Sequence, residues 1–430
     1  MMDKTNAARS VLIDNDHGGY TVPTKGLYPF QWNWDSAFVS MGFATFDINR
    51  AYQELERFIE GQWDDGMLPH IVFHQPSDTY FPGPDVWKTN YCHSKKPTTS
   101  GITQPPVFGT ALRYIYEKAL AADRNDILVR TRVLFYAALR SHRWWLKTRD
   151  PGKRGLVAIL HPWESGSDNS PTWDKALARV PITTKTEICR QDTKHVNATM
   201  RPRNIDYQQF IHLVEIYREC EWNPAKQWAQ APFKIADVQI TAILARATDD
   251  LIWLAPHLNL SDEINELSQM HHLLIDGLKS RWRNKFRGFI SLDLITNEDI
   301  EKSTQSCFIP LIALELNIQH RELIRNEIEH WCNGMVTGIP STAPFSSDFE
   351  SKRYWRGPVW AIINWLITDG LRKNHLIELA TIIEGNTINV IERAGFCEYF
   401  DPLTGEGLGG NTFSWTAAAY LVLRHRLINH

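Results

Sequence analysis

Hydrophobic residues recur along most of this chain at the three- and four-residue spacing that places them on one face of a helix. One such helix is predicted over residues 204–220, where Phe210, Leu213 and Val214 would share the buried face. Residues 236–255 are apolar on nearly all sides, which is the pattern of a helix enclosed by others. Helices therefore dominate the predicted structure.

Capping residues predict where further helices begin. Ser261 can cap a helix that runs to about Arg283, and Asn374 can cap a helix that continues through Ile383. Thr412 can cap the last helix, over residues 414–427. Strand-like alternation is scarce and local, as over residues 288–292. Periodic segments add candidate helices near residues 34–45, 47–63, 107–122, 126–148, 174–180, 309–317, 320–334 and 355–371.

The number of helices limits the possible folds. Roughly a dozen helices in one chain of this size form either a stacked superhelix or a closed toroid of helical hairpins. A superhelix would show a repeat of about 30–45 residues, and the sequence shows none. No low-complexity linker and no break in composition divides the chain. We therefore predict an all-α fold, an (α/α)6 barrel, in a single domain over residues 1–430.

Two long stretches, residues 64–106 and 148–203, lack the helical periodicity. Loops of such length are uncommon in a compact domain unless they are functional. Both stretches are rich in Trp, Tyr, Pro and His. We predict that they form the walls of a pocket at one end of the barrel and a lid over it.

Charge and cysteine content narrow the partners and the compartment. The formal net charge of the 430 residues is -3 at pH 7, so binding to nucleic acid or to an acidic membrane surface is not predicted. The N-terminal segment lacks a hydrophobic signal core, and apolar stretches such as residues 359–367 are too short to span a bilayer. The six cysteines are scattered, without a Cys-x-x-Cys pair. We expect a reduced, cytoplasmic protein, and the sequence leaves its oligomeric state open.

Aromatic residues are the outlier of the composition, with 17 Trp, 13 Tyr and 19 Phe. Most Trp side chains pack in protein cores, but many here stand beside Gly, Pro, Asn and Asp, where packing alone does not require them. Flat rings with a hydrogen-bonding edge suit the faces and hydroxyl groups of sugars. The composition therefore favours a carbohydrate-binding pocket.

The first of two Trp-rich segments that frame an acid is residues 161–174, in which Trp163 and Trp173 flank Asp168. A carboxyl group among aromatic rings holds its proton near neutral pH, because loss of solvent disfavours its charged form. Asp168 is therefore the candidate general acid. The alternative is that Asp168 caps a helix that opens at Asn169 or Ser170.

The second segment, residues 395–407, holds Glu398 before a turn of aromatic residues and Pro402. Glycoside hydrolysis needs two carboxyl groups on opposite sides of a sugar ring, one to donate a proton and one to activate water or attack directly. Glu398 is the candidate base, and Glu406 is its rival within the segment. Either glutamate could instead be a solvated loop residue.

Two further clusters could contact a sugar. Tyr28, Trp32 and Asp35 could stack on a ring and bind its hydroxyl groups, although Asp35 could instead cap a helix that begins at Ser36. In the segment 353–360, Arg356 could bind a carboxylate through its fork of donors, or form a structural ion pair.

We predict no metal and no cofactor. His70 and His74 stand four residues apart, but Pro69 and the β-branched neighbours favour an extended segment, and no third ligand is evident. The chain has neither a glycine-rich phosphate loop nor a Gly-x-Ser-x-Gly nucleophile motif.

Five segments resemble glycoside hydrolase family 63, in its bacterial branch of mannosylglycerate and glucosylglycerate hydrolases, and more distantly the trehalases. They run in the family's order along nearly the whole chain: residues 31–38, 104–106, 163–170, 354–360 and 398–402, the last followed by Phe413-Ser414-Trp415. The resemblance implies an (α/α)6 barrel and an inverting mechanism. It assigns the acid to Asp168, in a Glu-Ser-Gly-x-Asp motif, and the base to Glu398 rather than Glu406.

The resemblance also implies substrate-binding positions. The sugar pocket would be lined by Tyr28, Trp32, Asp35, Gln104, Trp163, Gly166, Tyr354, Trp355 and Trp360. Tyr80, Arg201 and Tyr207 fall where the glycerate end would bind, and Arg203 is a rival for the place of Arg201.

Together these observations predict an inverting hydrolase of a small α-glycoside, 2-O-α-glucosylglycerate or 2-O-α-mannosylglycerate, that releases hexose and glycerate. One alternative is an α-glucosidase or trehalase-like hydrolase of neutral disaccharides on the same barrel. Another is a non-catalytic carbohydrate-binding protein, which would bind sugar without turnover. Glucose and mannose differ only at the 2-position, so one sequence does not decide between them.

Overall fold

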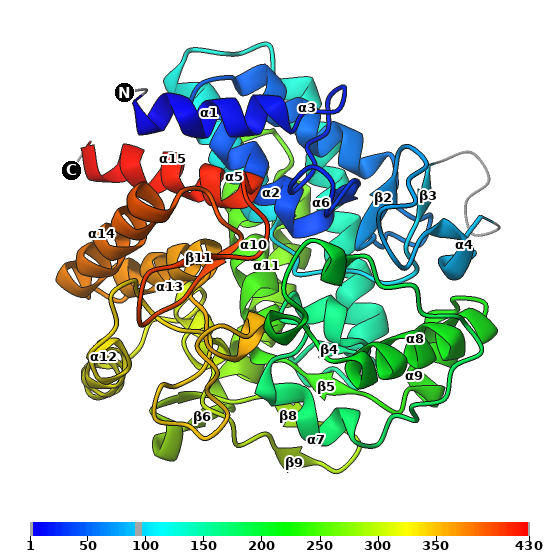
Figure 1. Cartoon of the computed structure of the whole chain (residues 1–430). Helices are drawn as coiled ribbons and strands as arrows, with labels where there is room; N and C mark the ends of the chain where they lie inside the picture. Colours follow the sequence, from blue (N-terminus) through cyan, green and yellow to red (C-terminus); the bar gives the residue numbers. More distant parts are fainter. Residues whose placement is uncertain (1–2, 91–96, 429–430) are drawn as a thin grey trace.

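The computed structural model describes residues 3–90 and 97–428, and helices are its main element (Figure 1). The long helices are α1 (Lys4–Asp14), α2 (Asn33–Phe43), α3 (Ile48–Ile59), α5 (Phe108–Ala121), α6 (Leu128–Arg149), α8 (Asn204–Glu219), α10 (Val238–His257), α11 (Ile264–Lys279), α12 (Ile318–Cys332), α13 (Ala361–Lys373), α14 (Ile377–Ala394) and α15 (Ser414–Ile428). The short helices are α4 (Pro84–Trp87), α7 (Asp174–Leu177) and α9 (Pro224–Gln230).

The strands are only two or three residues long and pair antiparallel at the edges of the helical body. One sheet joins β1 (Gln31–Trp32), β2 (Ile71–Phe73) and β3 (Thr98–Thr99). A second joins β4 (Ala158–Ile159), β5 (Ile235–Ala236), β8 (Leu292–Asp293) and β9 (Glu298–Asp299). Two hairpins pair β6 (Trp282–Arg283) with β7 (Gly288–Phe289), and β10 (Tyr399–Phe400) with β11 (Gly407–Leu408).

The inner elements form a closed ring of neighbours. Helix α2 packs against α5, α5 against α10, and α10 against the 3-10 turn η8 (Ile309–Ile312). The ring continues from η8 to α13 and α15, and α15 returns to α2. In Figure 1 the C-terminal helix α15 therefore lies beside elements from the N-terminal end of the chain.

Burial distinguishes the ring from the helices around it. Every residue of α2 is buried, as expected of a helix enclosed on all sides. Helix α3 instead buries one face against α2 and α5, and α1, α6, α11 and α14 likewise pack on the outside of the ring. The buried apolar residues form one connected cluster that extends from Ala8 to Leu423.

Three predicted helix caps are wrong. Asn374 ends α13 instead of opening α14, because its side-chain amide donates hydrogen bonds to the carbonyl groups of Leu311, Leu314 and Gly370. Ser261 opens the 3-10 turn η5 (Ser261–Glu263), and α11 begins after it. Thr412 precedes the position that caps α15, which belongs to Phe413, whose carbonyl accepts from Ala417.

Other predicted elements differ in length. Helix α1 was not predicted, because its buried face holds only Ala8, Val11 and Leu12 and its periodicity is weak. The candidate at 309–317 is the short turn η8, and the candidate at 355–371 begins only at Ala361.

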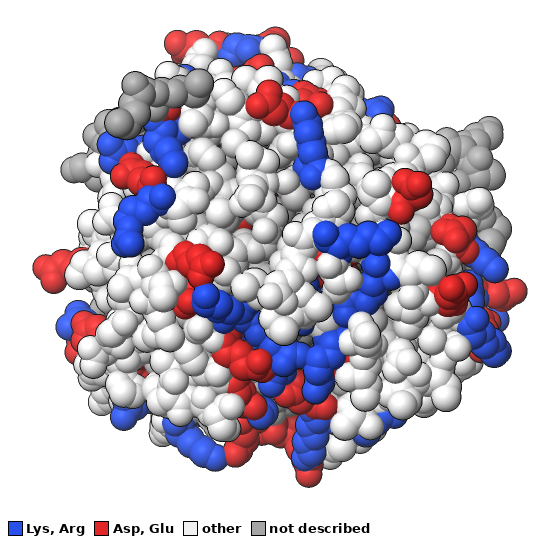
Figure 2. All heavy atoms as spheres, viewed as in Figure 1, with Lys and Arg blue, Asp and Glu red and all other residues white. Residues whose placement is uncertain are grey.

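The two stretches predicted as loops contain short elements of their own. Residues 64–106 include β2, α4 and β3, and residues 91–96 of this stretch lie outside the described residues. Residues 148–203 include β4, α7 and four 3-10 turns. Within the described part of the chain, no helix is long and apolar enough to cross a bilayer. On the face drawn in Figure 2, basic and acidic side chains are interspersed.

Candidate active site

A pocket lies where the N-terminal ends of the ring helices converge. Trp34 and Asp35 reach it from the first turn of α2, and Trp415 reaches it from the first turn of α15. Gln104 comes from the segment before α5, and Trp355 from the segment before α13. The closed ring thus brings together residues that are nearly the whole chain apart.

Nearly all residues predicted for the site line this one pocket. They are Tyr28, Trp32, Asp35, Tyr80, Gln104, Trp163, Gly166, Asp168, Arg201, Tyr207, Tyr354, Trp355 and Glu398. Trp360 is the exception, because it lies behind the pocket wall. Its ring stacks on that of Trp355 at 3.7 Å and 3°, and it is fully buried. Trp360 therefore supports the wall and does not form its surface.

The segment that carries Asp168 is held by its own backbone and by glycine. It runs between the 3-10 turns η1 (Pro162–Ser165) and η2 (Pro171–Trp173), and the Trp173 indole donates to the Ser167 carbonyl at 2.8 Å. Gly166 has φ +71°, and a Cβ there would lie 2.7 Å from the Trp34 ring. Glycine is therefore required both by the conformation and by the contact.

Asp168 does not cap a helix, so that alternative is wrong. Ser170 caps η2 instead. The Asp168 side chain is partly exposed to the pocket and otherwise enclosed by protein. Its pKa is raised to about 7: burial is the largest cause, Arg201 opposes it, and the charges of Glu398 and Asp192 add to the rise. At neutral pH the group is therefore protonated in a large fraction of molecules.

Glu398 precedes β10 and is fixed by the hairpin that β10 forms with β11. Its backbone N–H donates to the Gly410 carbonyl at 2.8 Å, and the Gly410 N–H donates to Oε2 at 3.0 Å. The Tyr28 hydroxyl donates to Oε1 at 3.1 Å, and Arg201 Nη1 lies 3.5 Å from the same oxygen. Burial raises the pKa of Glu398, while Arg201, Gly410 and Tyr28 lower it.

The rival Glu406 lies away from the pocket. Its side chain is 52% exposed and forms an ion pair with Lys352 at 2.5 Å. Glu406 is therefore a solvated loop glutamate, the alternative that the sequence left open for Glu398 and Glu406.

Arg201 is the buried cation of the site. Its Nη2 donates to the Tyr28 hydroxyl at 2.7 Å, and its Nε donates to Asp192 at 3.1 Å. Its guanidinium lies 4.1 Å from the centre of the Tyr354 ring. Arg203, its rival, has a side chain that is 60% exposed and pairs with Asp206 outside the pocket.

Two other predicted side chains have defined positions. Asp35 lies inside the first turn of α2 and so does not cap a helix at Ser36; burial raises its pKa well above the usual range. Arg356 forms the structural ion pair, with Asp174 at 2.9 Å, and also donates to the Asn169 carbonyl.

Several lining residues were not predicted: Pro23, Trp34, His70, Phe81, Asp192, Phe413 and Trp415. Trp34 and Trp415 lie in segments that resemble the family. Each has other aromatic residues beside it, so the sequence does not show which ring faces the pocket. Asp192 carries no sequence signal, because its place depends on Arg190 and Arg201, which both bind it.

The two histidines are separated by their extended strand. His70 lines the pocket against the Trp163 ring, and burial lowers its pKa well below the usual range. His74 Nε2 lies 2.7 Å from Gln31 Oε1. Among the residues that the structure describes, no group of three or more His, Cys, Asp or Glu side chains could hold a metal ion.

Known families and proteins are similar to this chain over almost its full length. The family model described as the mannosylglycerate hydrolase MGH1-like glycoside hydrolase domain matches residues 28–416. A mannosylglycerate hydrolase from Thermus thermophilus is 45% identical over 415 residues, which are 96% of this chain and 99% of that protein. A glucosylglycerate hydrolase from Mycolicibacterium hassiacum is 33% identical over 441 residues, with 96% of each chain covered.

Solved structures agree with the sequence similarity. The family 63 mannosylglycerate hydrolase from Thermus thermophilus, in complex with Tris and D-glycerate, matches with a TM-score of 0.93 and 44% identity over 97% of this chain and 99% of that one. Neutral trehalase from Saccharomyces cerevisiae matches with a TM-score of 0.61 and 14% identity over 94% of this chain and 73% of that one, which shows a shared fold alone.

Proposed function

The chain belongs to the mannosylglycerate hydrolase MGH1-like glycoside hydrolases of family 63, and from that premise we propose that it cleaves a small α-glycoside of glycerate with inversion. The substrate would be 2-O-α-mannosylglycerate or 2-O-α-glucosylglycerate, and the products hexose and glycerate. The observation that carries the proposal is a pair of enclosed carboxyl groups, Asp168 and Glu398, in one aromatic pocket.

Asp168 is proposed as the general acid. A general acid must hold a proton at the working pH and release it to the glycosidic oxygen in the transition state. The pKa of about 7 meets that requirement. Among the described residues, no other side chain donates a hydrogen bond to its carboxylate, so its proton is not displaced by a fixed donor.

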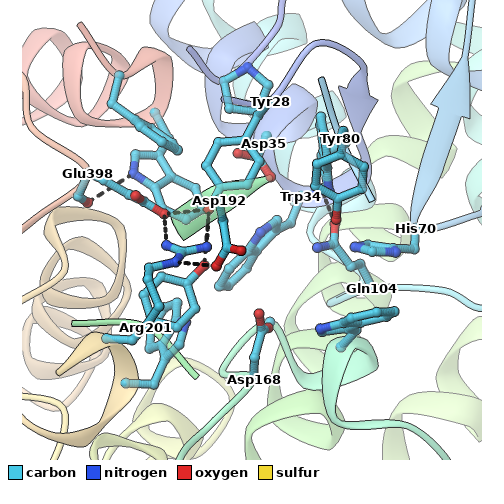
Figure 3. Close-up of a pocket in the computed structure, with 18 of the residues that line it drawn as sticks. Tyr28, Trp34, Asp35, His70, Tyr80, Gln104, Asp168, Asp192, Arg201 and Glu398 are labelled. Atoms are coloured by element: carbon cyan, nitrogen blue, oxygen red, sulfur yellow. Dashed lines mark hydrogen bonds and ion pairs between the residues drawn. The ribbon is translucent and has the colours of Figure 1, made fainter. Parts of the chain in front are cut away.

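Glu398 is proposed as the base. The donors Tyr28, Gly410 and Arg201 surround its carboxylate and stabilise the charged form that must accept a proton from water. In Figure 3, Glu398 and Asp168 enter the pocket from different sides. Inversion requires a gap of roughly 6.5–9.5 Å between the two carboxyl groups, so that a water molecule fits behind the anomeric carbon.

The glycerate end is proposed to lie on the Asp168 side, because the acid protonates the oxygen that leaves with glycerate. Tyr80 and Tyr207 are close enough to Asp168 for its charge to raise the pKa of both hydroxyl groups, although burial is the larger cause. Arg201 would attract the carboxylate of glycerate. Because Asp192 and Glu398 already flank Arg201, we infer that only a singly charged ligand is favoured there.

We also propose the finer architecture: an (α/α)6 barrel in one domain, with the stretches 64–106 and 148–203 covering the pocket. The closed ring from α2 to α15, the outer helices that alternate with it along the chain, and the connected core support the barrel. Tyr80 and Phe81 from the first stretch and Asp192 from the second line the pocket, which supports a covering role. The five described cysteines are unpaired, which supports a cytoplasmic location.

The test is hexose release by the purified protein from glucosylglycerate, mannosylglycerate, trehalose and α-linked glucose disaccharides. We expect turnover of the glycerate glycosides alone, and its loss in Asp168→Asn. Turnover of neutral disaccharides alone would overturn the substrate assignment and keep the mechanism. Full activity of Asp168→Asn would overturn the acid.

A further inference from the structure

A second cavity lies inside the ring of helices, beyond the floor of the acid pocket. Trp34 lines the pocket, and Phe38, one turn further along α2, lines the cavity. The two rings contact each other, with centroids 6.0 Å apart, and so separate the two spaces. Later turns of the same ring helices continue the wall, as Arg246 does on α10 and Arg426 on α15.

The cavity is large enough for a small molecule and is open to solvent. Its volume is about 370 Å³, and small-molecule sites have volumes of roughly 300–1,000 Å³. The side chains of Arg113, Arg246 and Arg426 remain 26%, 27% and 20% exposed, so a ligand can reach them.

One part of the wall is flat and aromatic. Phe38 and Trp365 contact each other at 5.4 Å between ring centroids, and Tyr114 also faces the cavity. Met41 and Leu366 complete the apolar surface. Because Phe38 and Trp365 are buried, the partly exposed Tyr114 ring is the aromatic surface that the C–H face of a sugar ring can contact.

The charged part of the wall is balanced. Arg113 and Arg246 both pair with Asp250, at 2.9 Å. Arg372 and Arg426 both pair with Glu384, at 2.6 Å. Asp369 and Glu117 supply the third and fourth negative charges against these four arginines. A neutral ligand is therefore favoured over a strong anion.

Polar groups in this wall lack partners within the described chain. The Trp365 indole N–H is buried without a hydrogen bond, and the Trp365 side chain is only 3% exposed. The Tyr114 hydroxyl makes no hydrogen bond to a described residue, and Arg246 uses only its Nε, which leaves both Nη groups available. The Trp365 N–H lies beneath the surface of the wall, whereas the Tyr114 hydroxyl and the Arg246 Nη groups can donate to a ligand oxygen.

We propose that this cavity is a second binding site, for a neutral polyhydroxylated compound such as a free hexose. Hydroxyl groups both donate and accept, and so match a wall of guanidinium and phenol donors beside carboxylate acceptors. The site is independent of the proposed hydrolysis, because none of its residues lines the acid pocket.

The test follows the indole N–H of Trp365 by NMR in the full chain labelled with ¹⁵N-tryptophan. The Trp365 signal is assigned by its loss in Trp365→Phe, and that of Trp34, which reports the acid pocket, by its loss in Trp34→Phe. D-mannose, D-glucose, glycerol and D-glycerate are the probes. We expect a saturable shift of the Trp365 signal with at least one hexose, with a dissociation constant different from that reported by Trp34.

Tyr114→Phe is the deciding variant, because it removes one hydroxyl that the fold does not use. Loss of one neutral hydrogen bond should weaken binding about three- to tenfold at Trp365 and leave binding at Trp34 and the thermal midpoint unchanged. A stronger response to a hexose than to glycerol would identify a sugar site rather than a general polyol site. A Trp365 signal that no uncharged probe moves, or one that tracks Trp34 and ignores Tyr114→Phe, would overturn the proposal.

Discussion

At the scale of single residues, Asp168 and Glu398 have different surroundings, which support the different roles proposed for them. Both carboxyl groups are enclosed, and burial raises the pKa of each. Glu398 accepts from Tyr28, Gly410 and Arg201, all of which favour its charged form. The side chain of Asp168 has no comparable set of donors among the described residues. Two carboxyl groups in environments that differ in this way are the usual basis of an acid and base pair.

The pH dependence of hydrolysis follows from Asp168. Because the acid must be protonated, kcat/KM should fall as the pH rises through about 7, its pKa. Asp168→Asn should remove this limb and lower kcat about 10²–10⁴-fold. Initial rates from pH 4 to 9 measure both effects, and an unchanged alkaline limb in the variant would contradict the assignment.

The pKa of Asp168 can also be tested through protein stability, without an activity assay. A carboxyl group with a raised pKa in the folded state favours folding when protonated, so its contribution is lost as the pH rises through about 7. The Tm of Asp168→Asn relative to the parent should therefore rise between pH 5 and pH 8. A constant difference across that range would count against the raised pKa.

Tyr28 is expected to tune the base. In the parent protein, the hydrogen bond from Tyr28 to Glu398 Oε1 lowers the pKa of Glu398, and Tyr28→Phe removes this bond. The acidic limb of the kcat/KM profile should move to higher pH, and kcat should fall about 10–100-fold, as for loss of a hydrogen bond to a charged group. Tyr399→Phe is the control, because its hydroxyl donates instead to the Met200 carbonyl, at 3.2 Å. Equal shifts in both variants would contradict a specific role for Tyr28.

At the scale of elements, short irregular pieces position the acids, and the helices position those pieces. The hairpin β10–β11 holds Glu398 through Gly410, and the 3-10 turns around Asp168 hold the acid against the Trp34 ring through Gly166. Short irregular segments have no periodic pattern in the sequence. Long helices could therefore be predicted from periodicity, whereas several helix caps could not. Asn374 shows the reason, because its amide satisfies carbonyl groups of residues up to 63 positions away.

Two glycines beside the hairpin give a matched comparison. Gly409 has φ +74°, and a Cβ there would lie 2.4 Å from Glu398 Oε2. Gly405 has φ +75°, but a Cβ there would approach no atom more closely than 3.6 Å. Both Gly→Ala variants should lose about 1 kcal/mol of stability from the left-handed conformation. Only Gly409→Ala should also displace Glu398 and lower kcat, and comparable kcat values in the two variants would contradict this account.

We expect Arg356 to act as a positioning residue for the segment that carries Asp168. It links the Asn169 carbonyl, at 3.3 Å, and Asp174 to the turn that carries Trp355. Arg356→Met should lower kcat about 10–100-fold through misplacement of Asp168, without moving the alkaline limb. Arg356→Lys should recover part of the loss. Arg353→Met is the control, because within the described part of the chain Arg353 pairs only with Glu350. An equal loss of kcat there would indicate a general structural effect.

At the scale of the whole molecule, the site depends on closure of the ring. Tyr28 and Glu398 are 370 positions apart and meet only because α15 packs against α2. The family resemblance could be recognised from the sequence because five segments keep their order. Two features of the site could not be predicted from the sequence, because they depend on how side chains are oriented within the closed structure. They are the pairing of Asp192 with Arg190 and Arg201, and the position of Trp360 behind Trp355.

The most direct test of the account is the anomeric form of the first hexose released from 2-O-α-mannosylglycerate or 2-O-α-glucosylglycerate, followed by proton NMR before mutarotation. An acid at Asp168 and a base at Glu398 that activates water on the opposite face predict the β-anomer as the first product. Release of the α-anomer would mean that a glycosyl-enzyme intermediate forms, and would contradict the proposed role of Glu398 as a base that activates water.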